Sequence, residues 1–437
     1  MAVSSGTTGG KVAAPIPATQ IPKGAWTIAT LLLLFMLVNF ADKVVVGLAG
    51  VPIMKELGLN QTDFGFLGSA FFFLFSITGV IGGFIVNRVQ TRWVLLGLAT
   101  VWALVQFPML TTVSYSTLLI CRIILGAGEG PAYAVAVHAL YKWFPDEKRA
   151  MPTALLSQGS AFGVILAVPS LNWLVVNYTW HAAFGALGVV GLLWALAWLA
   201  LGREGPLTGY EANAIGTKEA RVPYGKLLAS PTFIGCVVST FGAYWALSVG
   251  LTWFTPFLVQ GLGYSQKEAG LISVLPWLAG ATVVMLTGWL SQTMYGRGIV
   301  TRYSRGVIGS VPLILGGLVL LLGLPLATDR AAQVALLVLG TGLCGSIYVV
   351  CPPMIGEIAP VAQRGAVLAI YGALYALAGV LAPFIMGKVL DSAASPLDGY
   401  MTGYKLLAII QITAGVLGLL LLRPNWDRAR IMRPVAA

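Results

Sequence analysis

The chain has 437 residues, of which 58% are hydrophobic and 9% are charged, and its mean hydropathy is +0.86. A soluble protein carries charge on roughly a quarter of its positions. This composition excludes a cytosolic enzyme and a disordered chain, and it predicts a polytopic membrane protein. The net charge of +11 does not indicate a nucleic-acid-binding protein, because the basic residues are scattered along an apolar chain.

Twelve apolar stretches are long enough to cross a bilayer as helices, which takes about 20 residues each. Cutting the chain at charges, turns and polar clusters predicts spans near residues 25–48, 64–87, 93–113, 115–141, 151–173, 181–201, 231–259, 267–292, 303–324, 331–356, 365–388 and 401–422. No charged residue divides 150–202, so we place a turn there at VNYTWH, from Val176 to His181. The predicted fold class is an all-α polytopic membrane protein with twelve transmembrane helices in two six-helix halves.

The longest connection, 202–230, contains charges of both signs together with Gly and Pro, which is typical of a linker. We expect five parts: a cytoplasmic N-terminal tail (1–24), an N-terminal half (25–201), a cytoplasmic linker (202–230), a C-terminal half (231–422) and a cytoplasmic C-terminal tail (423–437). With the N-terminus inside, 19 of the 26 Lys and Arg residues fall in inside segments and 5 in outside segments. This bias predicts cytoplasmic termini. The first apolar run is long enough to span, so no signal peptide is expected.

Four charged residues remain within the predicted spans: Asp42, Lys43, Arg122 and Glu129. An ionised group at mid-bilayer costs at least ~2.5–3.5 kcal/mol, and such residues mark transport pathways by default. Arg122 and Glu129 share one helix face about 10 Å apart, so they cannot pair directly. Asp42 and Lys43 point about 100° apart, so one can face the fourth helix and the other a cavity. The pattern indicates an anion site with a proton relay. The alternative is a structural salt bridge between two helices.

The sequence around Glu129 reads GAGEGPAYA, with Gly126, Gly128, Gly130 and Pro131 in close succession. Small residues permit close helix approach, and proline permits a bend. The alternative is the ordinary enrichment of Gly and Pro in membrane helices.

Three sequence segments resemble a known family. Twelve helices divided six and six are similar to the major facilitator superfamily. Within it, CRIILGAGEGPAYA (Cys121 to Ala134) followed by YKWFP (Tyr141 to Pro145) resembles the fourth helix of the anion:cation symporter family. NFADK (Asn39 to Lys43) resembles the end of its first helix, and TWFTPFLVQGLGYSQKEAGLISVLPWLAGA (Thr252 to Ala281) resembles its seventh and eighth. The resemblance implies the major facilitator fold and alternating access. It also implies proton-coupled import of organic anions.

The resemblance also implies roles for single residues. Asp42 and Glu129 would be the protonation sites. Arg122 would bind the substrate carboxylate or exchange partners with Glu129. Lys43 stands where the family has Arg, so it keeps the charge but loses the bidentate fork. Gln158 matches a polar substrate-contacting position, for which a helix–helix hydrogen bond is the alternative.

Two cytoplasmic loops depart from the family's pattern. After the second helix the family reads G-x-L-x-D-R-x-G-x-R, whereas this chain reads GGFIVNRVQTR, with Asn87 in place of the Asp beside Arg88 and Arg92. After the eighth helix Gln292 replaces an Asp. Because these acids form gating contacts in the family, we hypothesise a weakened latch of the outward-facing state. An Asn87→Asp variant with unchanged transport rate and state populations would refute this hypothesis.

The expected pocket is more aromatic than is usual for the family, with Phe75, Tyr244, Trp245, Tyr371 and Tyr375. Polyhydroxylated sugars need many hydrogen-bond partners, so aromatic walls favour an aromatic or short-chain carboxylate over a sugar acid. Alternatively, these aromatic residues pack helices together or form interface belts.

His138 lies nine residues past Glu129 and is a candidate for a proton path toward the cytoplasm. The alternative is an interfacial polar residue without a role in transport.

We expect no cofactor, no metal and no enzymatic activity, since the chain has no Cys/His cluster and no HExxH, GxSxG, Walker or Rossmann fingerprint. The expected partners are an organic carboxylate, protons and the lipid bilayer, without nucleic acid. We expect a monomer in a bacterial inner membrane. The main alternative is a proton-coupled multidrug or metabolite antiporter, although the fifth helix lacks the Gly-Pro motif usual in that class. Anion exchange and sodium-driven symport stay open.

Overall fold

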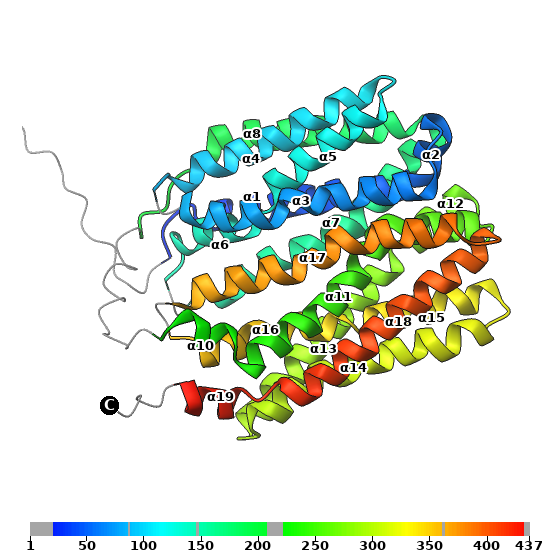
Figure 1. Ribbon diagram of the computed structural model, residues 1–437. Coiled ribbons are helices and arrows are strands. Elements are labelled where there is room, and N and C mark those ends of the chain that lie inside the picture. Colours follow the sequence, from blue (N-terminus) through cyan, green and yellow to red (C-terminus); the bar gives the residue numbers. More distant parts are fainter. Residues whose placement is uncertain (1–20, 86–87, 146–147, 208–221, 361–362, 432–437) are drawn as a thin grey trace, which may run out of the picture.

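A computed structural model describes residues 21–85, 88–145, 148–207, 222–360 and 363–431. Within these ranges, twelve helices are long and apolar enough to cross a membrane. They form one bundle in which the first and second halves of the chain lie side by side (Figure 1). Each span begins and ends within five residues of its predicted limits, so the predicted fold class is confirmed.

The first half contains six spans and one short extra helix. The extra helix, α2 (Gly50–Leu57), was not predicted. The six spans are α1 (Ala25–Leu48), α3 (Gln61–Ile85), α4 (Thr91–Gln106), α5 (Tyr115–Glu129) with α6 (Ala132–Tyr141), α7 (Ala150–Asn177) and α8 (Trp180–Leu201). A 3₁₀ turn, Phe107–Leu110, extends α4. The turn between α7 and α8, at Tyr178 and Thr179, confirms the predicted division of residues 150–202.

The second half contains six further spans, and the helices of four of them are continued or joined by 3₁₀ or π-helical turns or by short breaks. The spans are α11 (Pro231–Pro256), α12 (Gln266–Ile272) with α13 (Leu275–Gly296), α14 (Ile308–Leu318), α15 (Arg330–Gly342) with α16 (Gly345–Ile358), α17 (Arg364–Asp391) and α18 (Pro396–Leu421). Two short helices, α10 (Tyr224–Leu228) and α19 (Pro424–Ile431), flank this half. They lie in the segments predicted as linker and C-terminal tail.

Several spans begin at side-chain caps that the sequence supplies. Ser114 and Ser230 accept hydrogen bonds from backbone N–H groups in the first turns of α5 and α11. Ser265 and Glu268 form a reciprocal capping box at the start of α12. Asp329 and Ser395 cap α15 and α18. Each cap satisfies an N–H group that has no partner within the helix.

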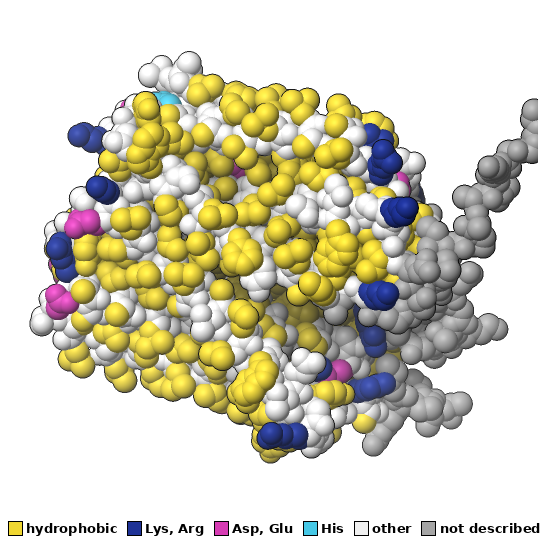
Figure 2. Space-filling model, turned by 180° about the vertical axis from the view of Figure 1, so that it is seen from behind, with side chains coloured by type: hydrophobic (Ala, Val, Ile, Leu, Met, Phe, Trp, Pro, Cys, Tyr) yellow, Lys and Arg dark blue, Asp and Glu magenta, His cyan; other side chains and the backbone are white. Residues whose placement is uncertain are grey.

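On the face shown in Figure 2, hydrophobic side chains cover the middle of the bundle, whereas most of the Lys, Arg, Asp and Glu side chains lie toward its two ends. Large apolar side chains project outward from this belt, among them Leu326, which is 81% exposed, and Trp289, which is 67% exposed. Such a surface is stable against lipid and not against water.

The two halves are joined at the end of the bundle where α3 begins and α17 ends. Asp391 accepts hydrogen bonds from the backbone N–H groups of Gln61 and Thr62, at 3.1 and 2.8 Å. Gln266 Nε2 donates to the Leu48 carbonyl at 2.9 Å. Helices α3 and α17 lie side by side along this interface, and α10 and α19 lie at the opposite end of the bundle (Figure 1).

Candidate functional site

Helices α1 and α5 bring the four predicted intramembrane charges into one buried region. Asp42 and Glu129 are each 1% exposed, and Arg122 is 5% exposed. The Lys43 side chain is 9% exposed. Burial of this depth makes each charge dependent on its neighbours, because a charge without a partner is strongly disfavoured there.

Lys43 and Glu129 form an ion pair, with Lys43 Nζ 2.7 Å from Glu129 Oε2. The same ammonium group donates to Asn39 Oδ1 at 2.5 Å, one helical turn earlier on α1. It also lies 4.3 Å from the centre of the Phe40 ring. Glu129 therefore has a cationic partner from the neighbouring helix, and Asn39 helps to hold that cation in place.

Asp42 points toward a different partner, as the 100° angle between adjacent helical residues requires. Its Oδ1 accepts a hydrogen bond from Gln106 Nε2 on α4 at 2.9 Å. Arg122 Nη1 donates to the backbone carbonyl of Asp42 at 3.3 Å. The two carboxylates thus occupy separate environments. Glu129 pairs with a lysine, and Asp42 is held by an amide beside an arginine.

Two polar atoms of this region, Trp102 Nε1 and Arg122 Nε, have no hydrogen-bond partner within the described ranges. A buried polar group without a partner costs about 1–3 kcal/mol. Two unpaired donors beside the buried charges fit a site that receives water or a polar ligand.

Glycines on and next to α5 let its backbone pack directly against the backbone of α3. A Cβ added at Gly126 would lie 1.7 Å from the Phe71 carbonyl oxygen, and one at Gly130 would lie 2.0 Å from that of Phe75. The fourth span then breaks between Glu129, the last residue of α5, and Ala132, the first of α6. The predicted close approach is confirmed, and the helix is interrupted at Gly130 and Pro131, where the bend was predicted.

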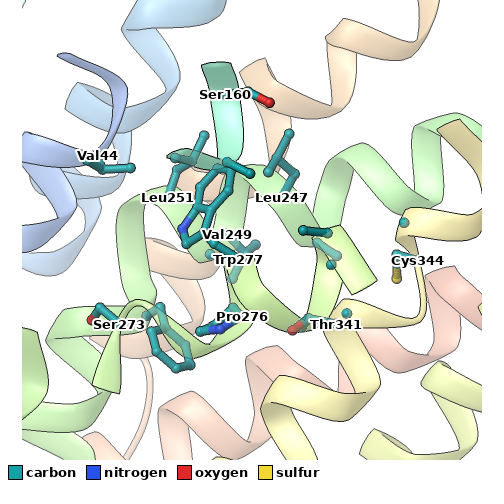
Figure 3. A pocket seen from close by; sticks show the side chains of 18 of the residues that line it. Val44, Ser160, Leu247, Val249, Leu251, Ser273, Pro276, Trp277, Thr341 and Cys344 are labelled. Atoms are coloured by element: carbon teal, nitrogen blue, oxygen red, sulfur yellow. The ribbon is translucent and has the colours of Figure 1, made fainter. Parts of the chain in front are cut away.

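A cavity of about 440 Å³ lies between the two halves, lined by side chains from α1, α7, α11, α13, α15, α16 and α18. Gln158 of α7 is part of its wall, as predicted. The Trp277 indole of α13 projects among side chains from the surrounding helices (Figure 3). Among the described residues that line this cavity, none is charged.

Phe40 contacts both the cavity and one of the charged residues. Its side chain lines the cavity, its ring lies against Lys43 Nζ, and it forms a T-shaped pair with the Trp277 ring, with centroids 6.2 Å apart. Phe40, Trp277, Gln106, Asn39 and Trp102 had not been singled out from the sequence. The sequence signal for Gln106 is an isolated glutamine in an otherwise apolar third span.

Three of the five predicted aromatic residues, Tyr244, Tyr371 and Tyr375, form one cluster. Tyr244 and Tyr375 have ring centroids 5.0 Å apart, and Tyr371 and Tyr375 are 4.9 Å apart. Phe75 lies 5.7 Å from Lys43 Nζ. Trp245 packs against Phe241 instead. The described lining of the 440 Å³ cavity does not include these five predicted residues, so their contact with substrate stays a prediction. His138 lies half-buried on α6.

The predicted gating residues occupy different surroundings. Asn87 lies outside the described residues. Arg88 and Gln292 are exposed. Arg92 Nη2 donates to the Leu199 carbonyl at 2.9 Å, a contact within the N-terminal half.

Glu204, which was not predicted, organises the end of the bundle where α4 begins. Its carboxylate accepts hydrogen bonds from Thr91 and from the Arg92 backbone N–H, and it pairs with Lys142. Burial raises the pKa of the Glu204 carboxyl, but the hydrogen bonds from Lys142, Arg92 and Thr91 outweigh burial and hold this pKa below its ordinary value.

Comparison with known proteins identifies the family. The model of the Major Facilitator Superfamily matches residues 31–343. The chain belongs to the Major Facilitator Superfamily. It is therefore a membrane transporter and not an enzyme.

Curated relatives in this superfamily are named as anion transporters. The chain is 28% identical over 406 residues to a hexuronate transporter of Bacillus subtilis, covering 89% of this chain and 95% of that protein. It is 24% identical over 399 residues to a D-galactonate transporter of Escherichia coli O6:H1, covering 85% and 91%. A probable chloroplastic anion transporter of rice is 28% identical over 306 residues, covering 67% of this chain and about half (51%) of the longer plant protein.

Solved structures show the same fold. A bacterial homologue of the human lysosomal transporter Spinster, inward-facing and unoccupied, superposes with a TM-score of 0.75 at 18% identity, covering 95% of this chain and 99% of that one. A D-xylose-proton symporter gives 0.73 at 18% identity, covering 92% and 99%. The predicted major facilitator fold is confirmed.

Proposed function

We propose that this protein is a secondary transporter that imports an organic carboxylate together with protons by alternating access. The names of its relatives support an organic anion as the substrate class. The observation that carries the proposal is the buried arrangement of two carboxylates and two cationic groups on α1 and α5.

The coupling follows from competition for one cation. Glu129 and a substrate carboxylate are the same chemical group, so both compete for Lys43, which Glu129 holds at 2.7 Å. Protonation of Glu129 removes its charge and frees Lys43 for the substrate. Proton and anion therefore favour each other's binding, because each lowers the cost of the other's charge. Release of the proton returns Lys43 to Glu129 and expels the anion.

Arg122 and Asp42 form the second part of the proposed site. The Nε of Arg122 has no partner among the described residues, so the guanidinium can donate more than one hydrogen bond to a substrate carboxylate. Asp42 lies beside it and is proposed as the second protonation site. Phe40 would have to move to let a substrate reach Lys43 from the cavity.

The cavity favours an aromatic or short-chain body over a sugar. Its volume of about 440 Å³ suits a small molecule. Gln158 is the one side-chain amide among its described lining residues, whereas a polyhydroxylated substrate needs many partners.

We further propose that both termini are cytoplasmic and that a monomer works in a bacterial inner membrane. The excess of Lys and Arg in the inside segments supports the orientation. In Figure 1, α6, α10 and α19 lie at one end of the bundle. Trp26, at the start of α1, contacts Phe144 at that end.

The test is uptake into proteoliposomes with an imposed pH gradient, a sodium gradient or neither, using a panel of labelled organic acids. We expect accumulation of a carboxylate driven by the pH gradient. Failure of every carboxylate to move would refute the proposal. Accumulation driven by sodium alone would refute proton coupling, and acidification during cation efflux would point to antiport.

Two variants assign the roles. Glu129→Gln should abolish gradient-driven accumulation yet permit counterflow exchange, because Lys43 stays free for the anion. Arg122→Ala should lose substrate binding. Glu268→Gln is the matched control, since Glu268 is exposed and Gln can also serve in a capping box. Normal accumulation by Glu129→Gln would show that this residue is not a coupling site.

A further inference from the structure

Two buried tyrosine hydroxyls in the C-terminal half lack hydrogen-bond partners among the described residues. They belong to Tyr348 on α16 and Tyr404 on α18. Both side chains line the 440 Å³ cavity. A phenolic hydroxyl can donate one hydrogen bond and accept others, and leaving it unmet in a buried place is costly.

Other buried tyrosines of the same half do have partners. The Tyr371 hydroxyl lies 2.6 Å from Thr240 Oγ1. The Tyr400 hydroxyl donates to Gln260 Oε1 at 3.1 Å. The unmet hydroxyls of Tyr348 and Tyr404 are thus not a general feature of tyrosines in this protein, and both belong to side chains that line the cavity.

The other polar groups in this part of the wall are already engaged. Thr341 Oγ1 donates to the Leu337 carbonyl at 2.7 Å. Ser273 and Thr255 bond to each other at 2.9 Å. Cys344 Sγ lies 2.9 Å from Gln411 Nε2. Among the described lining residues on this side, the tyrosine hydroxyls are therefore the polar groups without a partner inside the protein.

We propose that Tyr348 and Tyr404 form a second polar subsite, which binds an uncharged hydrogen-bonding group at the far end of the substrate. The described cavity wall carries no basic residue, so a second carboxylate there would be left without a counter-charge. The substrate class is then a monocarboxylate with an apolar or aromatic body and a neutral hydroxyl, carbonyl or amide group opposite the carboxylate. This inference rests on the proposed function for the carboxylate end.

Matched pairs of aromatic acids test the subsite without assuming a length for the substrate. We suggest benzoate with 4-hydroxybenzoate, phenylacetate with 4-hydroxyphenylacetate, and cinnamate with 4-hydroxycinnamate. The wild-type protein should take up the hydroxylated member of at least one pair with the lower KM. Tyr348→Phe and Tyr404→Phe should each reduce that preference roughly 2- to 10-fold, the value of one hydrogen bond, with little change for the parent acid. Tyr400→Phe, whose hydroxyl is bonded to Gln260, should keep the preference.

Stability provides a second readout. Because neither hydroxyl has a partner, both Tyr→Phe variants should unfold at the same temperature as the wild type or higher. A lowered unfolding temperature would assign the hydroxyls a structural role and overturn the inference. Equal preference within all three pairs in the wild type, or an unaltered preference in both variants, would also overturn it. These outcomes are separate from failure of the proposed function, in which no carboxylate of the larger panel would move at all.

Discussion

The packing of Gly126 against α3 makes a quantitative prediction. In Gly126→Ala the new methyl group would lie 1.7 Å from the Phe71 carbonyl oxygen, whereas ordinary contacts of a Cβ atom begin at 3.4 Å. The obstacle is backbone, which cannot turn aside as a flexible side chain can. Helices α3 and α5 must therefore move apart near the charged site.

A control variant separates the free-energy cost of the clash from the change in helix propensity. Overpacking of a well-packed interface costs about 1–3 kcal/mol. Alanine favours a helix interior over glycine by roughly 1 kcal/mol, which offsets part of this cost. Gly97 on α4 has no atom within 4 Å of its added Cβ, so Gly97→Ala gains the same propensity without the clash. The difference between the two variants should therefore be about 1–3 kcal/mol.

The assay measures the unfolding midpoint of the purified protein in detergent, with heat or denaturant as the cause of unfolding. Uptake is measured in parallel. We expect Gly126→Ala to unfold earlier than Gly97→Ala. We also expect Gly126→Ala to lose transport, because α5 carries both Arg122 and Glu129. If the two variants were equally stable, the close approach of α5 to α3 would not limit packing, and the reasoning would fail.

Three further predictions concern residues outside the proposed coupling pair. Because the pKa of Glu204 is lower in the folded protein, the unfolded state binds more protons. The stability from Glu204 is thus present above its ordinary pKa of about 4.3 and is lost as the pH falls through the folded value. In Glu204→Gln the unfolding temperature should therefore fall less as the pH is lowered. An unchanged pH profile of the unfolding temperature would contradict this prediction. Gln106→Leu removes the side-chain donor of Asp42 and should cost about 1–3 kcal/mol. The exposed control Gln292→Leu should cost much less, and equal losses would argue against the buried contact. Ser265→Ala breaks a capping box and should cost about 0.5–2 kcal/mol. No change in denaturant midpoint would show that α12 does not depend on this cap.

Much of the fold could be predicted because the bilayer imposes length and apolarity on each span. That constraint located the twelve spans and the turn at Tyr178 and Thr179. It says little about short helices between spans, so α2 was missed. Intramembrane charges stand out against an apolar background, which is why Asp42, Lys43, Arg122 and Glu129 could be singled out.

The neutral partners of these charges could not be predicted in the same way. Asn39 and Gln106 are ordinary polar residues in sequence, and their role depends on how far each helix is rotated toward its neighbours. Phe40 and Trp277 are two of many aromatic residues, and which of them line a cavity depends on the relative position of the two halves. The resemblance to a family singled out Tyr244 and Tyr375, whose rings are in contact, and Phe75, which lies near Lys43.

The contact of Asp391 with α3 has a consequence for following the transport cycle. Gln61 and Thr62 are the first two residues of α3, and their N–H groups have Asp391 of the other half as acceptor. Part of the N-terminal cap of helix α3 is therefore supplied by the other half, which would move away under the proposed alternating access when this end opens. These two amides report on the separation directly. Their hydrogen-exchange rates should measure the fraction of time that the halves are apart, in lipid and without any attached label.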